Sequence, residues 1–133
     1  MSQEQNIELA ERALEAFTKR DMEPFVACFH PSVEFMLPRN SLEGGSYRGF
    51  DGIRRAWADL YETWEDIRFQ HRESRATGDY VVILGRTTNV GKGMAPAVDY
   101  DSAYVLKIEQ GSIIRWQPYT SSAEALKAVG LEE

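Results

Sequence analysis

The 133-residue chain has little of several features that define whole classes of protein. Its single cysteine, Cys28, excludes an intramolecular disulfide and any metal or redox site built on paired cysteines. Its two histidines, His30 and His71, lack the HxH and HExxH spacings of metal sites, so we expect neither a metal nor a bound cofactor. No apolar run approaches the ~18 residues of a membrane span. The acidic, amphipathic N-terminus is unlike a signal peptide, so we expect a cytoplasmic protein without a membrane partner.

Positive charge is also scarce. The chain has fifteen Lys and Arg residues and twenty-one Asp and Glu residues, which gives a formal charge of −6. The basic residues are scattered along the sequence. Because phosphates need a clustered positive surface, we expect no nucleic-acid partner. With 43% hydrophobic and 27% charged residues the composition is that of an ordinary globular protein. The length predicts one domain over residues 1–133.

Helical spacing dominates the first half of the chain. Ser2 and Gln5 form a predicted capping box that opens a first helix. Its apolar stripe is Ile7, Ala10, Leu14 and Phe17. A second, short helix is predicted with the stripe Met22, Phe25, Val26 and Phe29, and a third from about Asp51 with the stripe Ile53, Trp57, Leu60 and Trp64. Ser121 and Glu124 predict a last helix, which Gly130 ends.

Alternating patterns predict strands elsewhere. The expected strands are Val33–Leu37, Ile67–Arg72, Tyr80–Val90, Val98–Ile108 and Ser112–Tyr119, with a loop over 38–49. Helices followed by consecutive strands indicate an α+β fold with an antiparallel sheet. Tyr80–Leu84 is apolar at both parities, so both faces of that strand are expected to be buried. We therefore expect a homodimer through the open face of the sheet.

Several stretches together resemble the SnoaL-like branch of the nuclear transport factor 2-like superfamily. They are Glu11–Phe17, Pro31–Phe35, Leu42–Gly49, Asp51–Arg54, Leu84–Arg86, Gly111–Arg115 and Glu124–Leu131. The resemblance implies a single SnoaL-like domain with a cystatin-like, cone-shaped α+β barrel. In this fold a curved antiparallel sheet wraps around N-terminal helices and encloses a pocket, usually in a homodimer. Its relatives include ketosteroid isomerase, polyketide cyclases and limonene-epoxide hydrolase, so activity must be argued from the site.

The isomerase residues do not transfer to this chain. Their tyrosine would fall near Ala13 and their base aspartate near Phe35. The hydrogen-bonding aspartate falls at Ala103, or at Tyr104 if the hairpin is one residue shorter. The apolar set Tyr104, Leu106 and Ile108 favours the second register, but which face of the strand points inward stays open. Ketosteroid isomerisation is therefore not expected.

Two candidate functions share the predicted pocket. The first is binding of an apolar or aromatic small molecule, and the expected wall residues are Phe17, Phe35, Trp57, Tyr61, Tyr104 and Trp116. Ordinary core packing is the alternative for these aromatic residues. The second is a cofactor-independent enzyme of acid–base type, such as a cyclase, isomerase, dehydratase or epoxide hydrolase, for which the candidate catalytic residues are Tyr104, His71, Arg86 and Asp101.

Three structural outcomes separate the hypotheses. An enzyme predicts at least two titratable groups converging in the cavity, whereas a binding protein predicts one or two polar points on apolar walls. A third possibility, a pure interaction module, predicts a filled cone and a large exposed apolar patch.

Overall fold

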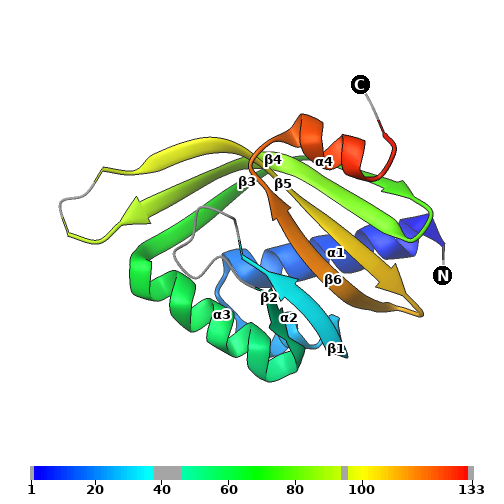
Figure 1. Cartoon of the computed structure of the whole chain (residues 1–133), viewed down its shortest axis with the longest axis horizontal. Coiled ribbons are helices and arrows are strands. Elements are labelled where there is room, and N and C mark those ends of the chain that lie inside the picture. Colours follow the sequence, from blue (N-terminus) through cyan, green and yellow to red (C-terminus); the bar gives the residue numbers. More distant parts are fainter. Residues whose placement is uncertain (1, 38–45, 94–95, 132–133) are drawn as a thin grey trace.

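A computed structural model describes residues 2–37, 46–93 and 96–131 (Figure 1). The first helix, α1 (Gln3–Thr18), begins at the predicted capping box. The Gln5 backbone N donates to Ser2 Oγ at 3.1 Å, and the Ser2 backbone N donates to Gln5 Oε1 at 3.0 Å. Two of the orphan donors of the first turn are thereby satisfied, as the sequence predicted.

The second helix is shorter than expected. It covers only Met22–Val26 (α2), and Phe29 is the first residue of strand β1 (Phe29–Met36). The helical interpretation of Phe29 was wrong because that residue pairs with Ile113 of a distant strand, whose backbone N donates to the Cys28 carbonyl at 3.0 Å. Long-range strand pairing has overridden a local apolar stripe.

Helix α3 (Gly49–Thr63) begins slightly earlier than expected and buries the predicted stripe of Ile53, Trp57 and Leu60. Trp64 is not part of the helix, because its backbone is extended and it is the first residue of β3 (Trp64–Thr77). Of the predicted loop, 46–48 form the short strand β2 (Ser46–Arg48), and 38–45 lie outside the described residues.

Six strands form one curved sheet in the order β2-β1-β6-β5-β4-β3. The remaining strands are β4 (Tyr80–Gly91), β5 (Val98–Glu109) and β6 (Ser112–Tyr119). All neighbours are antiparallel except β1 and β6, which run parallel, so the expected purely antiparallel sheet was wrong at this pair. A parallel pair needs a long crossover, and the chain supplies one through α3 and the three strands that follow it.

A close approach between β4 and the edge strand β3 requires a glycine. A Cβ atom on Gly85 of β4 would overlap the carbonyl oxygen of Gln70 and lie 2.6 Å from Phe69 Cζ on β3. The β3–β4 register shifts nearby, between His71 and Glu73. Glycine is needed here because the bulged strand leaves no space for a side chain.

The sheet curves around α1 and α3 on its concave side, while α4 (Ser122–Ala128) lies on the convex side (Figure 1). The main core lies between the two long helices and the concave face. Aromatic side chains fill much of it, and Phe35 and Trp116 stack with ring centroids 5.5 Å apart. The expected cone-shaped α+β architecture is confirmed. None of the described helices is long and apolar enough to cross a membrane.

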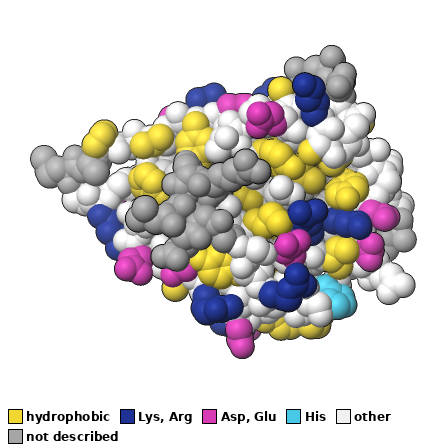
Figure 2. All heavy atoms as spheres, in the orientation of Figure 1, with side chains coloured by type: hydrophobic (Ala, Val, Ile, Leu, Met, Phe, Trp, Pro, Cys, Tyr) yellow, Lys and Arg dark blue, Asp and Glu magenta, His cyan; other side chains and the backbone are white. Residues whose placement is uncertain are grey.

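Helix α4 explains the strand that is apolar on both faces. Val82 and Leu84 point to the convex side, where they are fully buried against Ala125 and Leu126 of α4. Both faces are therefore buried, as predicted, but within one chain and without a second copy. Figure 2 shows charges of both signs interspersed with hydrophobic side chains on the face formed by β1, β6 and β5. A homodimer through the uncovered part of the sheet stays a prediction, which native mass spectrometry checks.

Candidate functional site

A cavity lies between α3, the end of α1 and the concave face of the sheet. The space between its walls is about 460 Å³ when open solvent at its mouth is included, but only about 30 Å³ of it can hold the centre of a water-sized molecule. Most of its wall is apolar and comes from Phe17, Phe35, Leu60, Trp64, Ile67 and Trp116. The room of about 30 Å³ is far below the range of about 300–1,000 Å³ typical of small-molecule sites, so a ligand larger than water needs the wall side chains to move apart.

The aromatic part of the wall is rigidly packed. Trp116 stacks on Phe35, and its ring centroid lies 4.8 Å from that of Tyr104. Phe69 packs edge-on against the other side of Tyr104, with the ring centroids 5.2 Å apart. Trp64 is only half-buried at the start of β3. Flat apolar surfaces of this kind suit a flat apolar ligand.

Polar groups gather on one wall, where β4 and β5 run side by side. Thr87 and Asn89 project from β4, and Tyr100 and Tyr104 from β5. Thr87 Oγ1 lies 2.6 Å from Ser102 Oγ in a buried hydrogen bond, and Asn89 Nδ2 donates to the Tyr100 hydroxyl at 3.4 Å. Strand alternation produces this row, because every second residue of each strand faces the cavity.

The two tyrosines are hydrogen-bonding groups rather than proton acceptors. Burial raises the pKa of Tyr100, which hydrogen bonding to Asn89 and Thr87 partly offsets. Burial also raises the pKa of Tyr104, with Tyr100 adding to the shift and Thr87 opposing it. Both hydroxyls therefore stay protonated near neutral pH and can donate to a carbonyl or hydroxyl oxygen.

The described wall carries no Asp, Glu, His, Lys or Arg side chain. A base that accepts a proton near neutral pH is therefore absent from the described part of the wall. Nor do the described residues contain a group of three His, Cys, Asp or Glu side chains that could hold a metal ion.

Phe17, Phe35, Tyr104 and Trp116, four of the six expected wall residues, line the cavity, whereas Trp57 and Tyr61 do not. Trp57 is 6% exposed and lies in the core against Phe17 and Phe25, at centroid distances of 5.6 and 4.9 Å. The Tyr61 ring lies under the Arg20 guanidinium, which is 3.6 Å from its centroid. Helical spacing places these two residues on the buried stripe, but that stripe faces the core over one part of its length and the cavity over another.

Of the four candidate catalytic residues, only Tyr104 lies in the cavity. Arg86 points to the convex face and pairs with Asp99, with 2.9 Å between Nη2 and Oδ1. Asp101 shares that face and accepts hydrogen bonds from the backbone N and the hydroxyl of Ser122, at 2.7 and 2.8 Å. These two side chains stabilise the convex side and do not converge with Tyr104.

His71 lies at the edge of the sheet beside α1. Its Nε2 is 2.8 Å from Ser74 Oγ and 3.6 Å from Glu11 Oε2. Its parity is that of Ile67 and Phe69, as expected, but it lies beyond the covered part of the strand, outside the cavity lining.

Three polar wall residues were not among the sequence candidates: Thr87, Asn89 and Tyr100. The parity that identifies them was visible in the sequence. Tyr100 lies four residues before Tyr104 on the same face of its strand, and Thr87 and Asn89 share the parity of the buried Ile83. Parity alone does not show where along a strand the packed core ends and the hollow begins.

A six-stranded curved sheet closed over helices, with a hollow under its concave face, defines a protein of the nuclear transport factor 2-like class. The chain belongs to the SnoaL-like domain family, whose sequence model matches residues 10–116. No curated protein matches the chain closely enough to support an assignment.

Solved structures with the same fold cover almost the whole chain. A nuclear transport factor 2-like protein of unknown function from Burkholderia pseudomallei is 19% identical, with a TM-score of 0.80 over 98% of this chain and 99% of that one. TerC, co-crystallised with polyporic acid, is 24% identical, with a TM-score of 0.78 over 94% and 97%. A hypothetical protein from Catenulispora acidiphila with a ketosteroid isomerase-like fold, in complex with trimethylamine, is 19% identical, with a TM-score of 0.74 over 93% of each chain. At these identities the likeness shows the fold.

Proposed function

We propose that this protein binds an apolar or aromatic small molecule in the concave cavity. The observation that carries the proposal is the division of the wall, which is aromatic and aliphatic on most sides and polar only along β4 and β5. Such a wall removes apolar surface from water and leaves a few polar groups to fix the orientation of the ligand.

Two features support binding. Side chains from both long helices and from several strands line one small hollow, with room of about 30 Å³ for water-sized molecules. Two of the similar structures are described with small organic molecules, polyporic acid in TerC and trimethylamine in the Catenulispora acidiphila protein. The fold is thus compatible with a small-molecule ligand.

The acid–base enzyme is the second candidate. The tyrosine pair favours it to the extent that two protonated hydroxyls can polarise a carbonyl group. Proton transfer also needs an acceptor, and the described wall offers none with a pKa near neutrality. The arrangement therefore supports binding better than catalysis.

The interaction module receives less support. Among the described residues, Val98 is the large hydrophobic side chain that is exposed, at 46%. One exposed side chain is not the extended apolar patch that a docking module needs.

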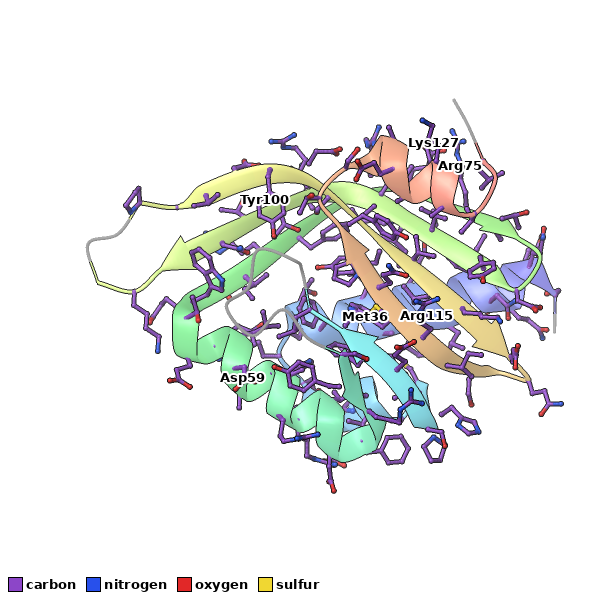
Figure 3. All side chains as sticks on the ribbon, in the orientation of Figure 1. Met36, Asp59, Arg75, Tyr100, Arg115 and Lys127 are labelled. Atoms are coloured by element: carbon purple, nitrogen blue, oxygen red, sulfur yellow. The ribbon has the colours of Figure 1, made fainter. Side chains whose placement is uncertain are left out.

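The test uses 2-naphthol, a flat apolar ring system with one hydroxyl group, and isothermal titration calorimetry at 25 °C. Met36 is half-buried on the cavity wall (Figure 3), so Met36→Trp should place an indole in the hollow. Met22 is also half-buried but lies on α2, outside the cavity lining, and Met22→Trp is the matched control.

We expect saturable binding of 2-naphthol to the wild type and to Met22→Trp, with at least a roughly tenfold weaker affinity for Met36→Trp. Circular dichroism establishes that both variants are folded. Absence of saturable binding to the wild type, or equal affinities in the two variants, would contradict the proposal.

A further inference from the structure

Asn89 lines the cavity, and its hydrogen bonding is incomplete. The side chain is only 6% exposed and projects from β4, between Ile67 of β3 and Val98 of β5 in the strand register. Its Nδ2 donates to the Tyr100 hydroxyl at 3.4 Å. Its Oδ1 is buried and has no hydrogen-bond partner among the residues that the structure describes.

The polar side chains next to Asn89 bond to one another in pairs. The Tyr100 hydroxyl oxygen accepts the Asn89 amide hydrogen. The Thr87 hydroxyl is bonded to that of Ser102. Figure 3 shows Tyr100 extending from β5 on the concave side of the sheet. Among the described residues, these bonds leave the buried amide oxygen of Asn89 without a donor, in a side chain that lines the hollow.

An amide oxygen that is buried without a donor is unfavourable, because it has lost its hydrogen bonds to water. Native proteins pair such atoms with protein, ordered water or ligand. Asn6, on α1, also has a buried Oδ1 without a partner among the described residues, but it lies outside the cavity. It provides an internal comparison, because a buried amide oxygen without a partner among the described residues occurs there away from the concave cavity, at a separate, more open surface pocket that Asn6 lines with Asp79 and Ile108.

We propose that the ligand of this cavity donates a hydrogen bond, from a hydroxyl or an N–H group, to Asn89 Oδ1 while its apolar body lies against Trp64 and Trp116. The inference rests on the proposed binding function and narrows the ligand class. It selects flat molecules with a phenolic or enolic hydroxyl, or a ring N–H, over ethers and hydrocarbons of the same shape.

The physical basis of the selectivity is the state of the amide oxygen in each complex. A ligand with a donor restores the hydrogen bond that Oδ1 loses when water leaves the cavity. A ligand of the same shape without a donor displaces the water and leaves the oxygen unpaired. Sites that hydrogen-bond a substrate hydroxyl reject analogues without that hydroxyl, because the polar group of the site is then left without a hydrogen-bond partner.

The test compares 2-naphthol with 2-methoxynaphthalene, which has the same ring system and no donor. Affinities for both compounds are measured by calorimetry on the wild type, on Asn89→Leu and on the matched control Asn6→Leu. We expect the wild type and Asn6→Leu to prefer 2-naphthol by about tenfold or more. In Asn89→Leu the preference should disappear, through weaker binding of 2-naphthol, while 2-methoxynaphthalene binds at least as well as before.

The outcomes separate this inference from the function on which it rests. If both compounds bind the wild type equally, or if the preference survives in Asn89→Leu, the donor assignment is overturned and the binding function stands. If neither compound binds the wild type, the binding function itself fails. Should Asn89→Leu not fold, Asn89→Asp keeps the size and the acceptor oxygens. A preserved preference for 2-naphthol in that variant supports the assignment, and its loss overturns it.

Discussion

Trp57 was expected in the ligand wall, and the structure places it in the aromatic core, so its truncation should change stability far more than binding. The side chain is 6% exposed and packs against Phe17, Phe25 and Tyr61. A buried tryptophan removes roughly 200 Å² from water, which at about 25 cal/mol per Å² is an upper bound near 5 kcal/mol. Its Nε1 has no partner among the described residues, so truncation breaks no hydrogen bond found in that part of the chain.

We expect Trp57→Ala to lower the free energy of unfolding by about 3–5 kcal/mol, the range for large-to-alanine changes in a core. The measurement is urea denaturation at 25 °C followed by far-UV circular dichroism, with the midpoint and the slope compared separately. Trp64→Ala is the matched comparison, because Trp64 is half-buried and lines the cavity. It should lose about half as much stability and show the larger loss of 2-naphthol affinity.

The reasoning is refuted if Trp57→Ala unfolds within about 1 kcal/mol of the wild type. It is equally refuted if the folded Trp57→Ala variant loses 2-naphthol affinity as strongly as Trp64→Ala does. Either result would assign Trp57 to the ligand wall instead of the core.

Three further predictions concern stability. Asp101→Ala should lower the free energy of unfolding by about 1–2 kcal/mol, because two hydrogen bonds to the start of α4 are lost. Asp99→Ala removes only an exposed ion pair, so its free energy of unfolding should stay within about 0.5 kcal/mol of the wild type in the same urea titrations. Burial raises the pKa of Tyr104, so above about pH 10 the unfolded state releases a proton that the folded state keeps, and stability falls by up to about 1.4 kcal/mol per pH unit for this group. Between about pH 10 and 11.5, Tyr104→Phe should therefore lose less stability than the wild type, measured by urea titration at each pH. Gly85→Ala should lower the free energy of unfolding by about 3 kcal/mol or more, because a β3 carbonyl occupies the space of the added methyl group, and a melting temperature close to that of the wild type would contradict this clash.

The sequence predicted much of the fold because its signals are local. The capping box of Ser2 acts within one helical turn. The long strand Tyr80–Gly91 was predicted from its largely apolar run, and Val98–Glu109 from its position between two sets of turn residues. The family assignment followed from several short stretches in the right order, and the match over residues 10–116 confirms it.

The candidate site was less predictable, because a cavity is what remains after distant elements have packed. Parity put Tyr104 and Asp101 on opposite faces of their strand but left open which face points inward, and the structure places Tyr104 inside. Parity did not separate Trp57 from Trp64, since one helical stripe suggested the same environment for both. Nor did it point to Asn89, whose amide oxygen has no partner within the described part of the chain, a property that depends on the side chains packed around it.

The amino-acid sequence by itself determined the helices, most of the strands and the face of each that is apolar, because these depend on side-chain periods of 3.6 and 2 and on contacts a few residues apart. Only the tertiary structure decided that β1 and β6 pair in parallel, that Phe29 is a strand residue and that α4 covers the convex face. Each of these depends on residues far apart in the chain meeting in one register. The free energy of these long-range pairings depends on the packing of the whole domain, so no single segment of the sequence predicts it.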